Sequence, residues 1–263
     1  MGDAAGVGRS GSRMTPFRAM RRGYEARFEP VERVVLAKVA RDVSAMLREE
    51  AGLDLFSDGG EPGPSSHHAP GKGQAWANGL LAPDELTDAD LARLTGVTGV
   101  GRIPTDPAAR RLLPDASKDD TDIADEFRRL TQNDVAQAKV DRLEAFAALL
   151  DLPSGDDAPS TVGRHGAPPP VRVPREDAEQ FAGALTDVRL VIAERLGLKT
   201  DDQVMHLTDE IMWDRQAGRE IPVATDGRAA RRFWSGVFVA AGYAQETLMD
   251  VMLAELRGKR PLA

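Results

Sequence analysis

The segment PREDAEQFAGALTDVRLVIAERLG, residues 174–197, decides the fold class of this chain. Apolar side chains recur within it at steps of three and four residues, which places them on one face of an α-helix. Proline opens the segment and glycine closes it, as is typical of helix starts and helix ends. The aligned apolar positions are Phe181, Leu185, Val188, Ile192 and Leu196. The sequence therefore predicts a helix from Pro174 to Leu196 with one face in a core.

The same periodicity predicts further helices on both sides of this segment. A helix is expected from Pro30 to Leu47, and its apolar face would carry Val31, Val34, Val35, Val39, Val43 and Met46. Another is expected from Asp134, as its N-cap, to Leu150, with Val135, Ala138, Leu143, Phe146 and Leu150 as its apolar positions. Shorter or less regular helical segments are predicted at 83–94, 107–113, 119–130, 202–215 and 229–256. In the last of these, the cost of glycine inside a helix leaves open whether the helix breaks near Gly242.

Strand signals are confined to two short stretches. Apolar and charged residues alternate from Tyr24 to Phe28, and Val171–Val173 follows three consecutive prolines. We expect these stretches to pair as a small two-stranded β ribbon. The predicted fold class is therefore mainly α, with five or six helices, this ribbon and two flexible Gly/Pro-rich insertions.

Composition divides the chain into ordered and flexible parts. Residues 1–15 have no apolar periodicity and are predicted to be a disordered tail. Residues 16–258 are predicted to form a single helical domain. Two stretches rich in glycine, proline and serine, 52–82 and 153–170, bury too little apolar surface to offset the cost of ordering, so we interpret them as flexible insertions.

Several classes of protein are excluded or disfavoured. The chain has no cysteine, so disulfides, thiolate metal sites and cysteine nucleophiles are excluded. Residues 1–13 are polar without an apolar core, so no signal peptide is expected, and no apolar run reaches the ~20 residues that a membrane span needs. We therefore expect a cytoplasmic location without membrane contact. No nucleophile–base pair or paired carboxylates stand out, so no enzyme activity and no cofactor are expected. His206 lies near Asp209, Glu210 and Asp214, but one histidine is a weak metal signal. The favoured interpretation is that these side chains cap a helix or lie in solvent at the surface.

The basic residues are concentrated at the N-terminal end. Residues 1–48 hold ten Lys and Arg against five Asp and Glu, although the whole chain has a net charge of −8. Arg18, Arg21 and Arg22 are the candidate contacts to DNA or to a protein partner, and a role as a solubilising tail is the alternative. The stretch LTQNDVAQAKV, residues 130–140, resembles the start of a helix-turn-helix motif, but it is acidic in context and lacks the turn.

Four segments together resemble one protein family. They are RLLPDASKDD (111–120), EFRRLT (126–131), LTDVRLVIAERLGL (185–198) and QETL (245–248), and RRGYEARFEPVE (21–32) is similar to the family's opening. The chain thus looks like a member of the actinobacterial AosR family, a domain of unknown function whose name refers to an oxidative-stress-responsive transcriptional regulator.

The resemblance implies a non-enzymatic cytoplasmic regulator of transcription. It would act through protein contacts, with a sigma factor or another transcription component as the expected partner, and DNA contact is left open. Because no cysteine exists, a response to oxidation through a cysteine pair is excluded, and any response would be indirect. The alternative function is an adaptor or structural protein associated with Clp-type proteolysis.

Overall fold

The computed structural model describes residues 14–53, 101–151, 169–217 and 227–258. The chain divides into two compact units: unit 1 comprises Met1–Ser44 and Asp141–Ala263, and unit 2 comprises Ala45–Val140. The described residues form six helices and one small antiparallel sheet, which confirms the predicted mainly helical fold class. Helices α1 (Pro30–Ala51) and α4 (Thr121–Leu150) each contribute residues to both units.

The sheet of unit 1 has the strand order β1-β2-β3, and both pairs are antiparallel. Its strands are β1 (Arg18–Met20), β2 (Gly23–Ala26) and β3 (Val171–Pro174). The predicted ribbon is confirmed, because Tyr24 pairs with Val173, whereas β1 is an additional strand that the sequence did not predict. A glycine is needed at position 23, since a Cβ atom there would lie 2.1 Å from the Val173 carbonyl oxygen.

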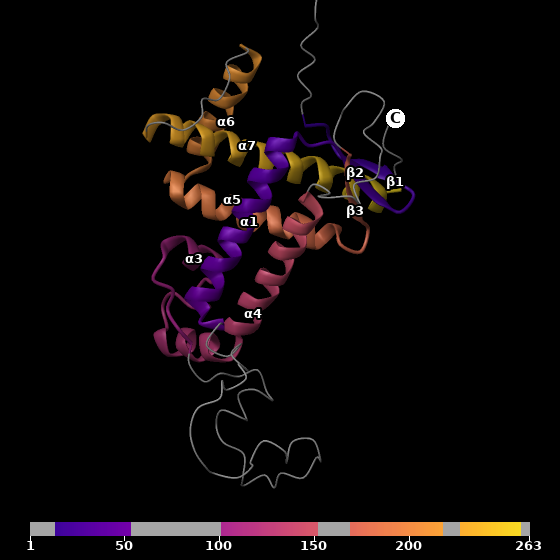
Figure 1. Cartoon of the computed structure of the whole chain (residues 1–263). Helices are drawn as coiled ribbons and strands as arrows, with labels where there is room; N and C mark the ends of the chain where they lie inside the picture. The colour runs from indigo at the N-terminus through magenta and orange to yellow at the C-terminus, as the bar shows by residue number, and fades with distance from the viewer. Residues whose placement is uncertain (1–13, 54–100, 152–168, 218–226, 259–263) are drawn as a thin grey trace, which may run out of the picture. The chain divides into compact units, whose positions relative to one another are not determined.

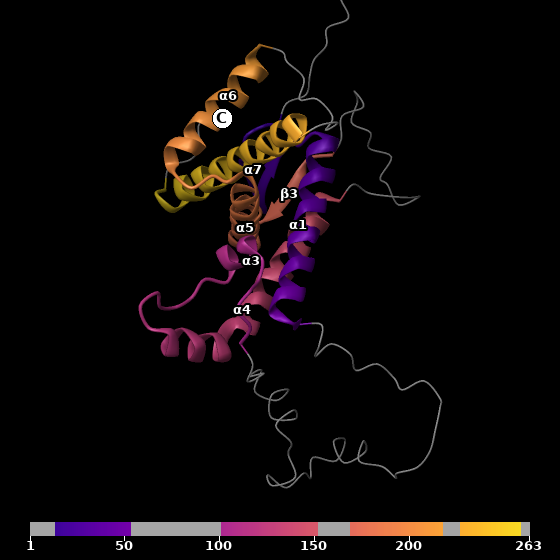
Figure 2. The same ribbon diagram turned by 90° about the vertical axis from the view of Figure 1, so that its left-hand side faces the viewer.

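Three helices make up the C-terminal part of unit 1: α5 (Ala178–Leu196), α6 (Asp201–Gln216) and α7 (Gly227–Leu256). Helix α5 packs on α7, and α6 lies alongside α7 (Figures 1 and 2). All five apolar positions predicted for α5 are buried. Gly197 closes α5 in the left-handed conformation with φ 71°, as its place at the end of the periodic segment indicates.

Four phenylalanines join the elements of unit 1 in one core. The rings of Phe146 and Phe181, from α4 and α5, have centroids 4.7 Å apart. Phe17, directly before β1, packs edge-on against both Phe181 and Phe28, with centroids 5.9 and 6.0 Å apart. Edge-to-face pairs at these distances are a favourable aromatic arrangement. They fix the sheet against α4 and α5.

Three predicted helix boundaries were wrong. Helix α5 begins at Ala178, because Pro174 ends β3 and its carbonyl accepts the Asp177 N–H in a turn. The two helices predicted at 119–130 and 134–150 are one helix, α4, since no glycine or proline interrupts the chain between them. Helix α7 continues through Gly242, where the sequence leaves a break open.

Two predicted apolar faces were partly wrong. On α1, Val31 and Val34 are exposed and Arg33 is buried, because the Arg33 guanidinium donates hydrogen bonds to the backbone carbonyls of Leu150 and Asp151 at the end of α4. On α4, Val135 and Ala138 are exposed, and the buried positions next to them along the helix are Ala136, one residue after Val135, and Val140, two residues after Ala138. Leu143, Phe146 and Leu150 are buried as predicted.

Unit 2 is organised around the start of helix α3 (Pro107–Leu112). The Asp106 carboxylate accepts the Ala108 N–H at 2.8 Å and caps this helix. The Glu50 carboxylate, near the end of α1, accepts hydrogen bonds from the backbone N–H of Thr105 and Asp106, at 2.6 and 3.1 Å. These contacts fasten the segment before α3 to the end of α1.

Several predictions fall outside the described residues. They are the helix at 83–94, nearly all of the tail at 1–15 and most of the insertions at 52–82 and 153–170. Of the tail, Met14 is buried and the Thr15 N–H donates to the Arg27 carbonyl at 2.9 Å. Among the helices that the structure describes, none combines the length and the apolar character needed to span a bilayer.

A polar cluster ties β2 to the end of α7. The Tyr24 hydroxyl donates to the Glu255 carboxylate at 2.8 Å, and Arg175 donates to the same carboxylate. The Arg175 guanidinium also lies over the Tyr24 ring, 5.3 Å from its centroid. The hydrogen bond from Arg175 lowers the pKa of Glu255, and burial, with the hydrogen bond to Glu255, raises the pKa of Tyr24.

The lowered pKa of Glu255 predicts an acid-dependent loss of stability. A carboxyl group whose pKa is lower in the folded state contributes stability above its unfolded pKa and loses it as the pH falls through the folded value. We therefore expect Glu255→Gln to lower the free energy of unfolding at pH 7 and to change it less at pH 3. Urea denaturation of both proteins at the two pH values checks this. A difference that is as large at pH 3 as at pH 7 would show that the ionised carboxylate contributes nothing.

Candidate functional site

The three arginines predicted to contact DNA or a partner lie on the hairpin at the edge of the sheet. Arg18 is in β1, and Arg21 and Arg22 form the turn between β1 and β2. All three side chains are exposed, and within the described residues no hydrogen bond or ion pair engages their guanidinium groups. They belong to a folded hairpin and not to a loose N-terminal arm, and their binding role stays a prediction.

Two of the segments that carry the family resemblance meet between α5 and α7. Arg189 donates to the Gln245 side-chain oxygen at 2.6 Å, and the Gln245 amide donates to the Thr186 hydroxyl at 2.6 Å. The Arg189 guanidinium lies over the Phe238 ring and beside Gly242, where a Cβ atom would be 3.5 Å from the Arg189 Nε. Burial lowers the pKa of Arg189. These residues cross-link two packed helices, which is a structural role.

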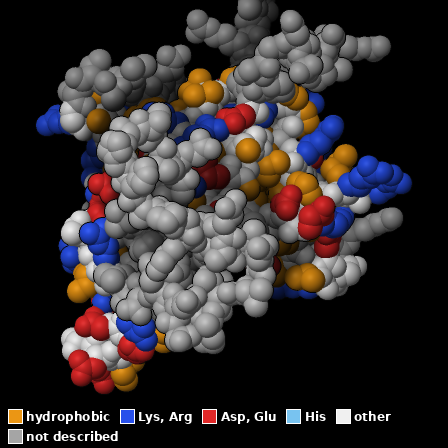
Figure 3. All heavy atoms as spheres, turned by 60° about the horizontal axis from the view of Figure 1, so that its bottom comes forward, with side chains coloured by type: hydrophobic (Ala, Val, Ile, Leu, Met, Phe, Trp, Pro, Cys, Tyr) orange, Lys and Arg blue, Asp and Glu red, His pale blue; other side chains and the backbone are white. Residues whose placement is uncertain are grey.

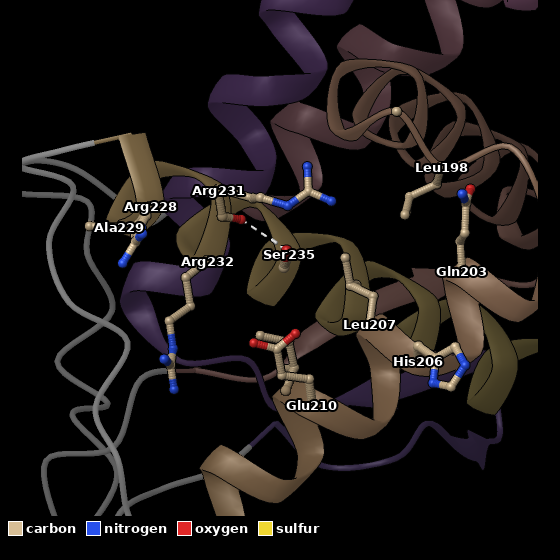
Figure 4. Close-up of a pocket in the computed structure, with 12 residues that line it drawn as sticks. Leu198, Gln203, His206, Leu207, Glu210, Arg228, Ala229, Arg231, Arg232 and Ser235 are labelled. Atoms are coloured by element: carbon tan, nitrogen blue, oxygen red, sulfur yellow. Dashed lines mark hydrogen bonds between the residues drawn. The ribbon is translucent and has the colours of Figure 1, made fainter.

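A pocket of about 760 Å³ lies between α6 and the first turns of α7, wholly within unit 1 (Figure 4). The charged and amide side chains that line it are Gln203, His206, Glu210, Arg228, Arg231 and Arg232. Figure 4 shows Arg228 and Arg232 extending on the same side of α7, with His206 and Gln203 at the other end and Glu210 between them. Pockets of this size accommodate small-molecule ligands.

Two arginines of this pocket are held by backbone or acidic partners. Arg231 donates to the Leu196 carbonyl, at the end of α5, at 2.8 Å. Arg232 donates to the carboxylate of Asp214, a residue that is 5% exposed. The Nε atom of Arg232 is buried and has no acceptor among the described residues. Arg228 is exposed, and its guanidinium has no partner there either.

The outward face of α6 carries large apolar side chains in contact with solvent. Met205 and Met212 are two turns apart and therefore share one face, and Trp213 follows directly. Their exposed fractions are 56%, 44% and 67%. Asp202 and Asp209 lie on the same exposed side of the helix. We call these five residues the α6 outer face. Contiguous exposed apolar side chains of this kind are typical of binding surfaces.

A second exposed apolar row lies in unit 2. Ile123, Phe127 and Leu130 occupy successive turns of α4 and are 58%, 50% and 42% exposed. The surface view in Figure 3 shows side chains of both charge signs interspersed with apolar ones among the described residues. Such a mixed surface does not single out a nucleic-acid face.

Neither the pocket nor the α6 outer face was predicted from the sequence. The stretch RAARR, residues 228–232, places Arg228, Arg231 and Arg232 at helical spacing, and this spacing is the signal that would have found them. His206 lies in the pocket wall, at the end away from Arg228 and Arg232. Within the ranges that the structure covers, no three histidine or carboxylate side chains converge as metal ligands would.

The fold and the pocket define a class of protein: a helical domain with a small sheet, an arginine-lined pocket and an exposed apolar helix face. Residues 14–252 match the family model described as "Domain of unknown function (DUF2017)". The chain therefore belongs to the DUF2017 family. Neither the curated proteins nor the solved structures include a significant match to it.

Proposed function

We propose that this protein is a non-enzymatic regulator that docks a partner protein on the α6 outer face. The proposed partner is a transcription component such as a sigma factor, and the setting is the cytoplasm of an actinobacterium under oxidative stress. The likeness to AosR-type regulators supports the setting. The observation that carries the docking role is the exposure of Met205, Met212 and Trp213 on one helix.

The size of the exposed apolar surface supports docking. Covering the exposed part of the Trp213 ring removes on the order of 100 Å² of apolar surface from water, or about 2.5 kcal/mol. Tryptophan is enriched among the residues that dominate binding energy, and methionine adapts to the shape of its partner. The row on α4 has no tryptophan or methionine, so the α6 outer face is the stronger candidate.

The charges beside the apolar side chains define the chemistry of the partner. Asp202 and Asp209 flank Met205, and Asp201 precedes them at the start of the helix. An amphipathic helix that presents apolar residues and Lys or Arg on one face complements this surface. The occupant that we propose is such a basic amphipathic helix of the transcription component.

The absence of cysteine limits how this regulator responds to oxidation. Because no thiol exists in the chain, thiol oxidation cannot switch it. The exposed Met205 and Met212 are chemically oxidisable, and the sulfoxide would be more polar than the thioether. A stress signal that does not oxidise these methionines would reach the protein through its partner.

Site-specific photo-cross-linking in living cells tests the proposal. A photoreactive phenylalanine analogue replaces Met212 in one strain and Arg172 in the control strain. Arg172 has an exposed side chain in β3 of the same unit, away from the α6 outer face. We expect position 212 to cross-link to a transcription component identified by mass spectrometry, and Trp213→Asp to abolish the product.

Three results would contradict the proposal. A product that forms equally at positions 212 and 172 would show that α6 is not a docking face. In a third strain the analogue replaces Ile123 of α4. A cross-link at position 123, with none at 212, would move the interface to unit 2. A cross-link from position 212 to a Clp protease subunit would support the adaptor function in place of transcriptional regulation.

A further inference from the structure

The pocket between α6 and α7 has more positive than negative charge. Its wall includes Arg228, Arg231 and Arg232, whereas Glu210 is its only lining carboxylate among the described residues. Asp214 does not line the pocket, but its ion pair with Arg232 offsets the positive charge of that arginine. The N-terminus of α7 adds about half a positive charge at the same end. The pocket is therefore electropositive although the chain as a whole is acidic.

The arginines are arranged so that hydrogen-bond donors stay available. Arg231 uses one nitrogen for the Leu196 carbonyl, and Arg232 uses one for Asp214, which orients both guanidinium groups without using all their N–H groups. The Nε of Arg232 is buried without an acceptor in the described part of the chain. A buried donor without an acceptor costs about 1–3 kcal/mol unless water or a ligand pairs with it. Because this enclosed atom has almost no accessible surface, a ligand in the pocket would pair with the terminal guanidinium nitrogens instead.

We infer that this pocket binds a small molecule through a phosphate group. Guanidinium groups donate paired N–H bonds that match the geometry of phosphate oxygens. Those of Arg228 and Arg232 extend on one side of α7, at one end of the pocket, whereas that of Arg231 extends away from them (Figure 4). A phosphate ester carries about −1.5 to −2 charges at pH 7, which suits a wall with an excess of arginine. No metal is needed for this recognition.

The rest of the pocket fits an organic group that carries the phosphate. The pocket volume of about 760 Å³ is far larger than a phosphate ion requires. Leu198, Leu207 and Ile211 supply an apolar wall, and Gln203 and His206 supply hydrogen-bonding groups at the end away from Arg228. Glu210 lies between the two ends and accepts hydrogen bonds from a hydroxyl or amino group (Figure 4). A phosphorylated metabolite is therefore the fitting ligand class.

This inference is independent of the proposed docking function, since it concerns the side of α6 that faces α7. The test is isothermal titration calorimetry of the full chain at constant ionic strength. The probes are inorganic phosphate, pyrophosphate, glucose 6-phosphate and ADP, with sulfate as the control anion. The variants are Arg228→Gln, whose side chain is exposed, and Arg257→Gln as the matched control directly after the other end of α7.

We expect at least one organic phosphate to bind more tightly than inorganic phosphate and sulfate. Arg228→Gln is expected to weaken this binding at least tenfold, and Arg257→Gln to leave it unchanged. Equal affinity in the wild type and Arg228→Gln would overturn the assignment, as would the lack of binding by all four phosphates. Binding of a short DNA duplex that depends on Arg228, without binding of any small phosphate, would assign the arginines to nucleic acid and also overturn it. Circular dichroism confirms that both variants keep the helical fold.

Discussion

Replacing Asp187 by alanine is expected to lower the free energy of unfolding by about 3–5 kcal/mol, the cost of breaking a buried ion pair. Asp187 lies in α5 and is 1% exposed. Its carboxylate accepts the Arg142 Nε–H at 2.7 Å and a second hydrogen bond from Arg142 Nη2. The alanine variant leaves the guanidinium, whose side chain is only 23% exposed, without this carboxylate.

Urea denaturation followed by circular dichroism measures this effect, and Asp42→Ala is the matched control. Asp42 forms an ion pair with Lys38 one turn away on α1, and both side chains are mostly exposed. The control should change stability by no more than about 0.5 kcal/mol, because solvent screens exposed pairs. Equal effects of the two substitutions would show that burial adds nothing to the Arg142–Asp187 pair.

A double substitution separates the pair from its surroundings. In Arg142→Met/Asp187→Leu both charges are absent, so no buried charge is left unpaired. We expect the double variant to be more stable than Asp187→Ala, although it lacks the same ion pair. A double variant as unstable as the single one would place the loss in the other contacts of Asp187.

Helix α5 was predictable because its periodicity reports burial directly. Every apolar residue aligned on α5, from Phe181 to Leu196, is buried, since α5 packs on α7 and contacts the sheet. The antiparallel pairing of Tyr24 with Val173 was predictable for a similar reason, because both strands alternate. Local patterns suffice where one face of an element meets the core.

Two differences from the sequence expectation arise from long-range polar contacts. Gly242 leaves a helix break open in the sequence, because glycine costs about 1 kcal/mol inside a helix. In the structure, α7 continues there, and the Arg189 guanidinium from α5 lies against the glycine. Likewise nothing near position 33 in the sequence shows that an arginine is buried there. Such contacts join residues that are distant in the sequence.

The candidate site was hidden for a third reason. Its pocket is built from two helices whose residues lie on both sides of the segment 218–226, and neither helix carries a known motif. The acidic neighbours of His206 in the sequence are only a weak metal signal, and nothing in them shows that His206 lines the same pocket as Arg228, Arg231 and Arg232. Residue spacing within one helix could not show which second helix faces it.

Replacing Arg33 by methionine is expected to cost about 3–5 kcal/mol, because hydrogen bonds from a buried charged group contribute about 1.5–3 kcal/mol each and are not additive. Arg33 is 4% exposed. Its Nε donates to the Leu150 carbonyl at 2.8 Å, Nη2 to the Asp151 carbonyl at 2.8 Å and Nη1 to the Pro169 carbonyl at 3.0 Å. Burial lowers the pKa of Arg33, but an arginine stays charged throughout the pH range in which proteins fold.

The three acceptors explain why the loss should be large. Leu150 is the last residue of α4, where the final carbonyls have no partner within the helix. One guanidinium satisfies the carbonyls of Leu150 and Asp151 and also fixes the chain just before β3. Methionine fills a similar volume but donates nothing, so these carbonyls lose their donors.

Arg41→Met is the control for this prediction, since Arg41 lies two turns further along α1 and, like Arg33, contacts Asp151. It donates to the Asp151 carboxylate at 2.6 Å, but both side chains are about half exposed. We expect Arg41→Met to change the free energy of unfolding by no more than about 1 kcal/mol. Arg33→Lys should fall between the two, because one ammonium group cannot reach three carbonyls in the geometry of a guanidinium. Urea denaturation compares the variants. If Arg33→Met proved no more destabilising than Arg41→Met, other contacts would hold the end of α4. The burial of Arg33 would then be a consequence of the packing and not its cause.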